Sequence, residues 1–210
     1  AGGGMERYPV SYLGVPDRGV NQTDDGEVLY LFSCSNLIPL KRVDKIIEAL
    51  ALTDGVRIHW THAGGGESEE EIHTLAQTLL GEKDSVTCEF LGAVENSEVI
   101  SFYKNRPVDL FLMASSTEGG SPVSIMEAFS FGVPAVGTSV GGISEMITEG
   151  TGYLLPADAQ PKEITEAILR FAGTSKEEKM KMRAAARSAW QEHFNDKKNH
   201  MAFAEKLNKL

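Results

Sequence analysis

Two glutamates flank a glycine-rich turn in the stretch SSTEGGSPVSIMEAFSFG, residues 115–132. Glu118 lies in the turn, whereas Glu127 falls within the apolar helix that is predicted to follow. Gly119 and Gly120 permit backbone conformations closed to other residues and let a ligand approach closely. Carboxylates on either side of such a turn suit the binding of a polar ligand. They would accept hydrogen bonds from hydroxyl groups of that ligand.

The start of the predicted helix has the pattern of an anion site. Ser121 suits the N-cap, and Pro122 suits the first helical position, where its missing N–H costs nothing. Val123 and Ser124 then present unpaired backbone N–H groups at the positive end of the helix, as phosphate sites do. Glu127 shares their face and its side chain leans towards them. A carboxylate there would repel phosphate but accept hydrogen bonds from sugar hydroxyls, so a ribose attached to a diphosphate fits.

A second loop carries cations. SCSNLIPLKR, residues 33–42, follows the first predicted strand and ends in Lys41 and Arg42. Ligands of open doubly wound sheets bind at the carboxyl ends of the strands, where the strand order reverses. With the common order 3-2-1-4-5-6, this loop and the glycine-rich turn would face each other across one crevice. Together they predict nucleotide binding; taken singly, Glu127 also fits an exposed helix position, the two glycines a plain turn, and Lys41 a solvated lysine.

Short apolar runs alternate with helical patterns and define the elements that must position these loops. The runs lie at residues 28–33, 56–63, 86–92, 108–115, 133–139 and 152–156. Several are apolar on both faces, which is typical of strands buried between two helix layers. The alternation predicts an α/β fold: a doubly wound, Rossmann-like parallel sheet of about six strands with right-handed crossovers.

The two ends of the chain differ from this central part. Residues 1–27 are rich in Gly, Pro, Asp and Asn and are predicted to form a linker or N-terminal extension. Residues 173–210 are predicted to form a C-terminal helical segment. Ser68 with Glu71 and Ser175 with Glu178 have the spacing of capping boxes, which predicts helix starts at both places.

Composition and the remaining motifs exclude several classes of function. Twenty basic and thirty acidic residues give a net charge of −10, which disfavours nucleic acid as a partner. Cys34 and Cys88 fall in predicted strands, so a reducing cytoplasmic compartment is expected. AGGGE at residues 63–67 follows the second strand and is not a dinucleotide fingerprint. His59 and His62 have no ligand-like partner at metal spacing, and no Asp-x-Asp motif suited to a divalent cation occurs.

The longest informative stretch is EGGSPVSIMEAFSFGVPAVGTSVGGISEMI, residues 118–147, which closely resembles the signature of the family-four retaining glycosyltransferases. SCSNLIPLKRVDKIIEAL resembles that family's phosphate-binding segment, and YLGVPDRG, residues 12–19, its interdomain linker motif. The resemblance covers residues 12–172. It implies that residues 28–172 form the nucleotide-sugar-binding, C-terminal domain of an enzyme built from two facing Rossmann-like domains.

The resemblance also implies roles for individual residues. Glu127 would bind the ribose hydroxyls, and Glu118 would face the donor sugar together with Gly119 and Gly120. Lys41 would neutralise the departing diphosphate, which makes Lys41 and Glu118 the expected catalytic residues. The expected nucleotide-binding residues are Lys41, Arg42, Ser121, Val123, Ser124 and Glu127. Gly141 and Gly142 open the next short helix, where lining the crevice and making a turn are equally good interpretations.

Two departures from the family pattern stand out. Glu118 and Glu127 lie nine residues apart, one more than the family's usual eight, which leaves the placement of Glu118 open. Asn36 stands where the family often has an arginine, so Lys41 remains as the main phosphate cation, helped by Arg42.

The resemblance implies a cytoplasmic, hexosyltransferase-type enzyme of polysaccharide biosynthesis that needs no metal or other cofactor. Its donor would be a UDP- or GDP-sugar, and its acceptor a glycan or lipid-linked molecule held by an N-terminal domain that this chain lacks. The isolated domain is expected to be inactive, and the resemblance allows peripheral membrane association of the full-length protein. Two alternatives stay open: a nucleotide-binding module without transferase activity, and a sugar-nucleotide epimerase.

Overall fold

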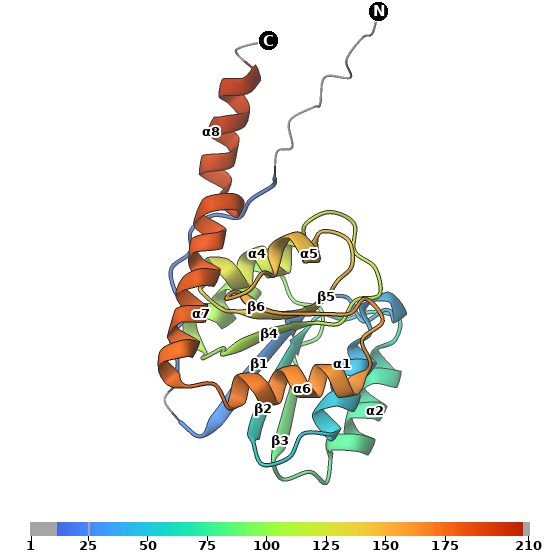
Figure 1. Ribbon diagram of the computed structural model, residues 1–210. Coiled ribbons are helices and arrows are strands. Elements are labelled where there is room, and N and C mark those ends of the chain that lie inside the picture. Colours follow the sequence, from blue (N-terminus) through green and yellow to red (C-terminus); the bar gives the residue numbers. More distant parts are fainter. Residues whose placement is uncertain (1–11, 25, 208–210) are drawn as a thin grey trace, which may run out of the picture.

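A six-stranded parallel sheet forms the centre of the protein (Figure 1). The structure is a computed structural model that describes residues 12–24 and 26–207, so the opening AGGGM lies outside the described part. The strand order is β3-β2-β1-β4-β5-β6, with all neighbours parallel. The strands are β1 Val28–Cys34, β2 Arg57–Ala63, β3 Val86–Phe90, β4 Leu110–Met113, β5 Ala135–Thr138 and β6 Gly152–Leu155. The predicted fold class and strand order are confirmed.

Helices cover both faces of this sheet. They are α1 Val43–Ala51, α2 Glu69–Leu80, α3 Asn96–Asn105, α4 Val123–Ser130, α5 Ile143–Met146, α6 Pro161–Ala172, α7 Lys176–Ala189 and α8 Asp196–Leu207. A 3-10 turn, Pro39–Lys41, precedes α1, and a π-helical turn, Trp190–Phe194, joins α7 to α8. One buried core lies between the sheet and α1, α2 and α6, and a second between the sheet and α3, α4, α5 and α7.

Successive residues of the central strands pack into the cores on opposite faces of the sheet, which explains the continuous apolar runs. Leu31 packs into the core beneath α1, whereas Phe32, the next residue of β1, packs into the core beneath α3. Leu110 and Phe111 repeat this division on β4. Because successive side chains of a strand point to opposite faces, a strand covered on both sides is apolar at most positions.

The segment before β1 and the C-terminal helices hold each other. Val15 forms a parallel bridge with Asn195 and accepts a hydrogen bond from the indole N–H of Trp190 at 3.0 Å. Arg183 of α7 is buried and donates to the backbone oxygens of Asn21 (2.7 Å) and Val108 (2.8 Å). The predicted C-terminal segment is thus two helices, and Figure 1 shows α8 extending beyond the sheet. Among the described residues, no helix combines the length and the apolar character needed to cross a membrane.

Of the two predicted capping boxes, one is confirmed and one is wrong. The Ser175 hydroxyl accepts from the backbone N–H of Glu178, whose carboxylate accepts in return. Ser68 does occupy the N-cap of α2, but its side chain makes no capping hydrogen bond. Its backbone is not extended (φ −94°, ψ 12°), because its own N–H donates to the carbonyl oxygen of Leu37 in the neighbouring loop.

A chain of buried polar groups crosses β1 and β2. The indole of Trp60 donates to the Ser33 hydroxyl at 2.9 Å, and that hydroxyl lies 2.8 Å from Nδ1 of His62. Nε2 of His62 lies 3.1 Å from the carbonyl oxygen of Ser35. Since a carbonyl oxygen can only accept, Nε2 carries the proton and Nδ1 accepts from Ser33. Burial disfavours the imidazolium and lowers the pKa of His62 to about 4.

This histidine makes stability depend on pH. Unfolded His62 takes up a proton near its ordinary pKa of about 6.5, whereas the folded protein resists protonation until about pH 4. His62 therefore contributes its full stabilisation above about pH 6.5 and loses it as the pH falls towards 4, a change of roughly 3 kcal/mol. We expect urea unfolding at pH 7.5, 6 and 4.5 to show this loss, and His62→Gln to flatten it. His59→Gln, on the same strand but half-buried, should keep the wild-type dependence; an unchanged slope in His62→Gln would contradict the assignment.

Candidate functional site

The loop after β1 and the loop after β4 meet at the carboxyl end of the sheet, as the strand order predicts. The backbone N–H of Ser116 donates to the carbonyl oxygen of Leu40 at 2.9 Å, and the Ser116 hydroxyl donates to the same atom at 3.2 Å. The ammonium group of Lys41 forms an ion pair with the carboxylate of Glu118. The structure therefore brings together the two residues that were expected to be catalytic.

Glu118 accepts a second hydrogen bond, from a residue that the sequence did not single out. The hydroxyl of Ser115 donates to Oε1 of Glu118 at 2.7 Å, and the side chain of Glu118 is only 12% exposed. Ser115 is in turn fixed by Thr138 of β5, whose hydroxyl donates to its carbonyl oxygen at 2.5 Å. Glu118 is thus held in one place by Ser115 and Lys41, although it lies in a loop.

Helix α4 begins one residue later than predicted. Pro122 has φ −63° and ψ 127°, so its backbone is extended and it occupies the N-cap. The predictions of Ser121 as the N-cap and Pro122 as the first helical residue are therefore wrong. Val123 and Ser124 are the first two helical residues, and their N–H groups belong to the four that a helix cannot pair internally. The predicted anion site at the start of α4 keeps its geometry with this shift.

Glu127 is buried, with 6% of the residue exposed. The interpretation of Glu127 as an exposed helix residue is therefore wrong. Its Oε1 accepts a hydrogen bond of 2.7 Å from the side-chain amide of Asn96 at the start of α3. Burial raises the pKa of Glu127, while the hydrogen bond from Asn96 and the charge of Arg18 act in the opposite direction. A buried carboxylate needs such partners because desolvation disfavours the charged form.

The glycine pair after β5 supports the glycine-rich turn. Gly141 has φ +50°, and a Cβ there would lie 2.1 Å from the carbonyl oxygen of Glu118. A Cβ on Gly142 would lie 2.7 Å from the carbonyl oxygen of Gly120. Both glycines therefore let the β5–α5 loop pack directly on the Glu118 turn. A Cβ on Gly119 or Gly120 would meet nothing within 4 Å, so these two face open space.

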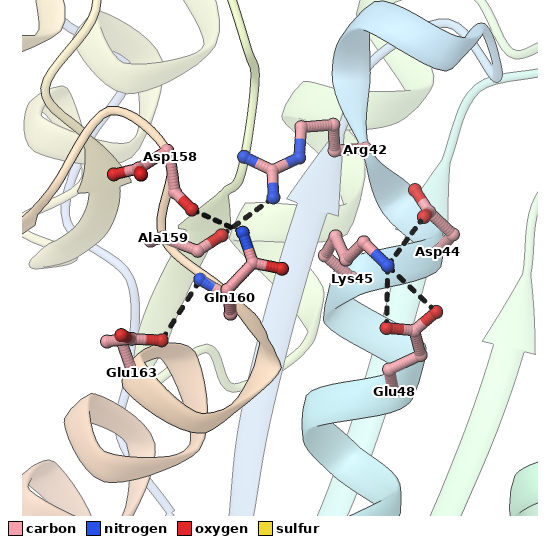
Figure 2. Close-up of polar contacts among 8 residues, drawn as sticks. All are labelled: Arg42, Asp44, Lys45, Glu48, Asp158, Ala159, Gln160 and Glu163. Carbon is pink, nitrogen blue, oxygen red and sulfur yellow. Dashed lines mark hydrogen bonds and ion pairs between the residues drawn. The ribbon is translucent and has the colours of Figure 1, made fainter.

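Arg42 lies next to Lys41 in sequence but contacts a different loop. Its guanidinium donates to the carbonyl oxygen of Ala159 at 2.7 Å, just before α6, as Figure 2 shows. Arg42 has a left-handed backbone (φ 51°) because it ends the 3-10 turn and caps α1 at once. The adjacent Lys45 is occupied by Asp44 and Glu48 on its own helix (Figure 2).

The glycines of AGGGE have a packing role. A Cβ on Gly64 would lie 1.9 Å from the carbonyl oxygen of Ser35, and one on Gly66 would lie 2.4 Å from that of Leu37. The β2–α2 loop therefore packs against the loop that carries Lys41. Across residues 12–24 and 26–207, no group of three or more His, Cys, Asp or Glu side chains is arranged to hold a metal ion.

Solved structures share this fold. Alr3699/HepE from Anabaena, in complex with UDP-glucose, matches with a TM-score of 0.76 at 22% identity, covering 100% of this chain and 59% of that chain. The lipopolysaccharide outer core galactosyltransferase WaaB matches with a TM-score of 0.75 at 20% identity, covering 96% of this chain and 56% of that chain. These likenesses establish the architecture.

Curated glycosyltransferases and a family model match the sequence. The amylovoran biosynthesis glycosyltransferase AmsK of Erwinia amylovora is 29% identical over 191 residues, 87% of this chain and 45% of that protein. The N-acetyl-alpha-D-glucosaminyl L-malate synthase of Bacillus anthracis is 36% identical over 127 residues, 59% of this chain and 31% of that protein. The chain spans less than half of the length of either relative. The model of the family described as Glycosyl transferases group 1 matches residues 17–189, so the predicted resemblance is confirmed and the chain belongs to this family.

Proposed function

We propose that the chain is the donor-binding domain of a retaining glycosyltransferase that uses a nucleoside-diphosphate sugar. The observation that carries the proposal is the convergence of three groups at one sheet edge: the Lys41 ammonium, the N-terminus of α4, and the buried carboxylate of Glu127. A cation and unpaired N–H groups suit a diphosphate, and a carboxylate suits a ribose. Family membership and the UDP-glucose complex of the Anabaena protein support it.

The donor is proposed to lie along the start of α4. The N–H groups of Val123 and Ser124 would bind the diphosphate, Lys41 would face it from the opposite loop, and Glu127 would accept the ribose hydroxyls. The donor sugar would occupy the open side of Gly119 and Gly120, near Glu118. Arg42 and Ser121 remain candidate nucleotide ligands; Arg42 would have to leave Ala159 to reach a phosphate.

Charge stabilisation is the proposed source of catalysis. When the bond from sugar to diphosphate breaks, negative charge grows on the departing phosphate and positive charge on the sugar ring. Lys41 and the positive end of α4 would stabilise the first, in a site arranged before the reaction begins. The carboxylate of Glu118 is proposed to stabilise the second. In this scheme no metal ion is required.

The acceptor is proposed to bind to an N-terminal domain outside this chain, as a glycan or lipid-linked molecule. The full-length protein would work in the cytoplasm, with peripheral membrane contact allowed, on polysaccharide biosynthesis. The isolated chain is expected to bind donor and transfer no sugar, because the acceptor half of the cleft is proposed to belong to that other domain.

Calorimetry with UDP and GDP in the presence of a chelator tests the proposal. We expect one of the two to bind at a single site, and uridine or guanosine without phosphates to bind far more weakly. Failure of both diphosphates to bind would refute the proposal. Product analysis with the full-length protein then separates a transferase, which needs an acceptor, from an epimerase, which interconverts donor sugars without one, and from a module that only binds.

A further inference from the structure

The carboxylate of Glu127 receives its one side-chain hydrogen bond, within the described part of the chain, from a residue of another helix. Asn96 is the first residue of α3, which begins after the loop that follows β3, and its amide lies 2.7 Å from Oε1 of Glu127. Asn96 is exposed, whereas Glu127 is buried. The hydrogen bond therefore joins an exposed residue of α3 to a buried carboxylate of α4.

Asn96 is free for this contact because its neighbours cap the helix. Glu95 is the N-cap of α3, and it forms a reciprocal capping box with Glu98. The side chain of Asn96, at the next position, takes no part in capping. An asparagine at the start of a helix ordinarily bonds its own backbone; here its amide points across to α4.

We propose that Asn96 is the positioning residue of the ribose subsite: it holds Oε1 of Glu127 and leaves Oε2 for a hydroxyl of the nucleotide. This inference rests on the proposed function and deepens it. A carboxylate has about four acceptor sites, so one amide bond fixes its plane without exhausting it. A fixed plane matters because a ribose presents two neighbouring hydroxyls, and a rotating carboxylate would meet them in only a fraction of its orientations.

Within the described residues, the other groups near Glu127 make no hydrogen bond to its carboxylate. Arg18 favours the carboxylate through its charge, without a hydrogen bond to it among the described contacts. Burial raises the pKa of the Cys34 thiol to about 11, so this group on β1 is neutral. The Tyr103 hydroxyl on α3 is buried, has no hydrogen-bond partner within the described residues, and its pKa is raised by burial. Asn96 therefore provides the orientation that these groups do not.

The test measures UDP or GDP affinity, whichever the wild-type chain binds more tightly, from pH 5 to pH 8. Asn96→Ala is expected to weaken binding about tenfold at pH 7, the loss typical of a hydrogen bond to a charged group. Its affinity should also fall off at a higher pH than that of the wild type, because the bond that favours ionised Glu127 is gone. Asn105→Ala, at the far end of the same helix, is the matched control and should bind as the wild type does; the Asn105 side chain donates hydrogen bonds to Ser101 of the same helix.

Asn96→Asp supplies the opposite pH signature. At pH 8 two adjacent carboxylates repel each other, so binding should be at least as weak as in Asn96→Ala. As the pH falls, one shared proton restores a donor to Oε1, so affinity should recover where that of Asn96→Ala declines. If Asn96 only stabilised the fold, the two variants would not differ in the direction in which affinity changes with pH.

Inorganic pyrophosphate distinguishes a loss of ribose binding from a loss of diphosphate binding. It carries no ribose, so all three variants should bind it as the wild type does. Wild-type affinity and pH profile in Asn96→Ala would overturn the role of Asn96 and leave the proposed function standing. An equal loss for pyrophosphate and nucleotide would also overturn it, because the effect would then lie outside the ribose subsite. A wild-type chain that binds neither UDP nor GDP would overturn the proposed function and this subsite together.

Discussion

Replacing Lys41 with alanine is expected to weaken nucleoside-diphosphate binding by roughly 1–3 kcal/mol, or about 5- to 150-fold. The ammonium pairs with Glu118 in the turn that precedes α4, and in the variant this carboxylate would be left without a cation. The variant thus loses an attractive charge and exposes a repulsive one. Calorimetry with the diphosphate that binds the wild type measures the loss, and sugar transfer by the full-length protein should fall at least as far.

Glu118→Gln and Lys45→Ala show whether this loss belongs to the site. Glu118→Gln removes the carboxylate that competes for Lys41, so binding of the diphosphate should tighten several-fold while transfer falls. Lys45 is engaged by Asp44 and Glu48 on α1, and its replacement should leave binding unchanged (Figure 2). If Lys45→Ala weakened binding as much as Lys41→Ala, the effect would reflect net charge instead of a specific contact.

Glu127→Gln is expected to separate function from stability. The carboxylate is buried and its pKa is raised, so the ionised form at neutral pH costs the folded state free energy. The amide keeps the shape and an oxygen for Asn96 but carries no charge. We expect the free energy of unfolding at pH 7 to rise, while nucleoside-diphosphate affinity falls tenfold or more because the ribose hydroxyls lose a charged acceptor.

Glu127 also affects how the stability of the wild type depends on pH. Because the folded protein holds a proton on Glu127 more tightly than the unfolded chain does, this group destabilises the fold as the pH rises through its raised pKa. Glu127→Gln should abolish this contribution. Glu149→Gln, on an exposed turn after α5, should change neither property. A less stable Glu127→Gln that still binds like the wild type would show that the carboxylate serves the fold instead.

The strands and their order were predictable because burial on both faces leaves a strong signal in sequence. The run at residues 108–115 is mostly apolar, yet only Leu110–Met113 forms β4. Pairing with β1 ends at Phe111 and pairing with β5 ends at Met113, so Ala114 and Ser115 lead into the site loop. Apolar character reports burial, and both of these residues are buried, so it cannot mark where the ladder of hydrogen bonds stops.

The sequence predicted which loops lie side by side at the site. It did not predict which side chains of those loops contact each other. Strand order places the Lys41 loop beside the Glu118 loop, but the ion pair joins residues 77 positions apart. The bond from Asn96 to Glu127 spans 31 positions and follows no local rule. Arg42 was grouped with Lys41 by adjacency, whereas its left-handed backbone directs it to Ala159. Side-chain direction is set by backbone details that residue type and spacing do not contain.

The buried Arg183 has a consequence for how such domains can be exchanged between enzymes. Its guanidinium bonds the backbone oxygens of both Asn21 and Val108, so a chimera that joins the sheet of one protein to the terminal helices of another would strand a charge in the interior unless Asn21 came with it. Chimeras that keep every strand and helix intact but take Arg183, Asn21 and Val108 from different parents should fold poorly. The segment before β1, the residues just before β4 and α7 are therefore expected to stay together in functional chimeras, with successful crossovers outside them.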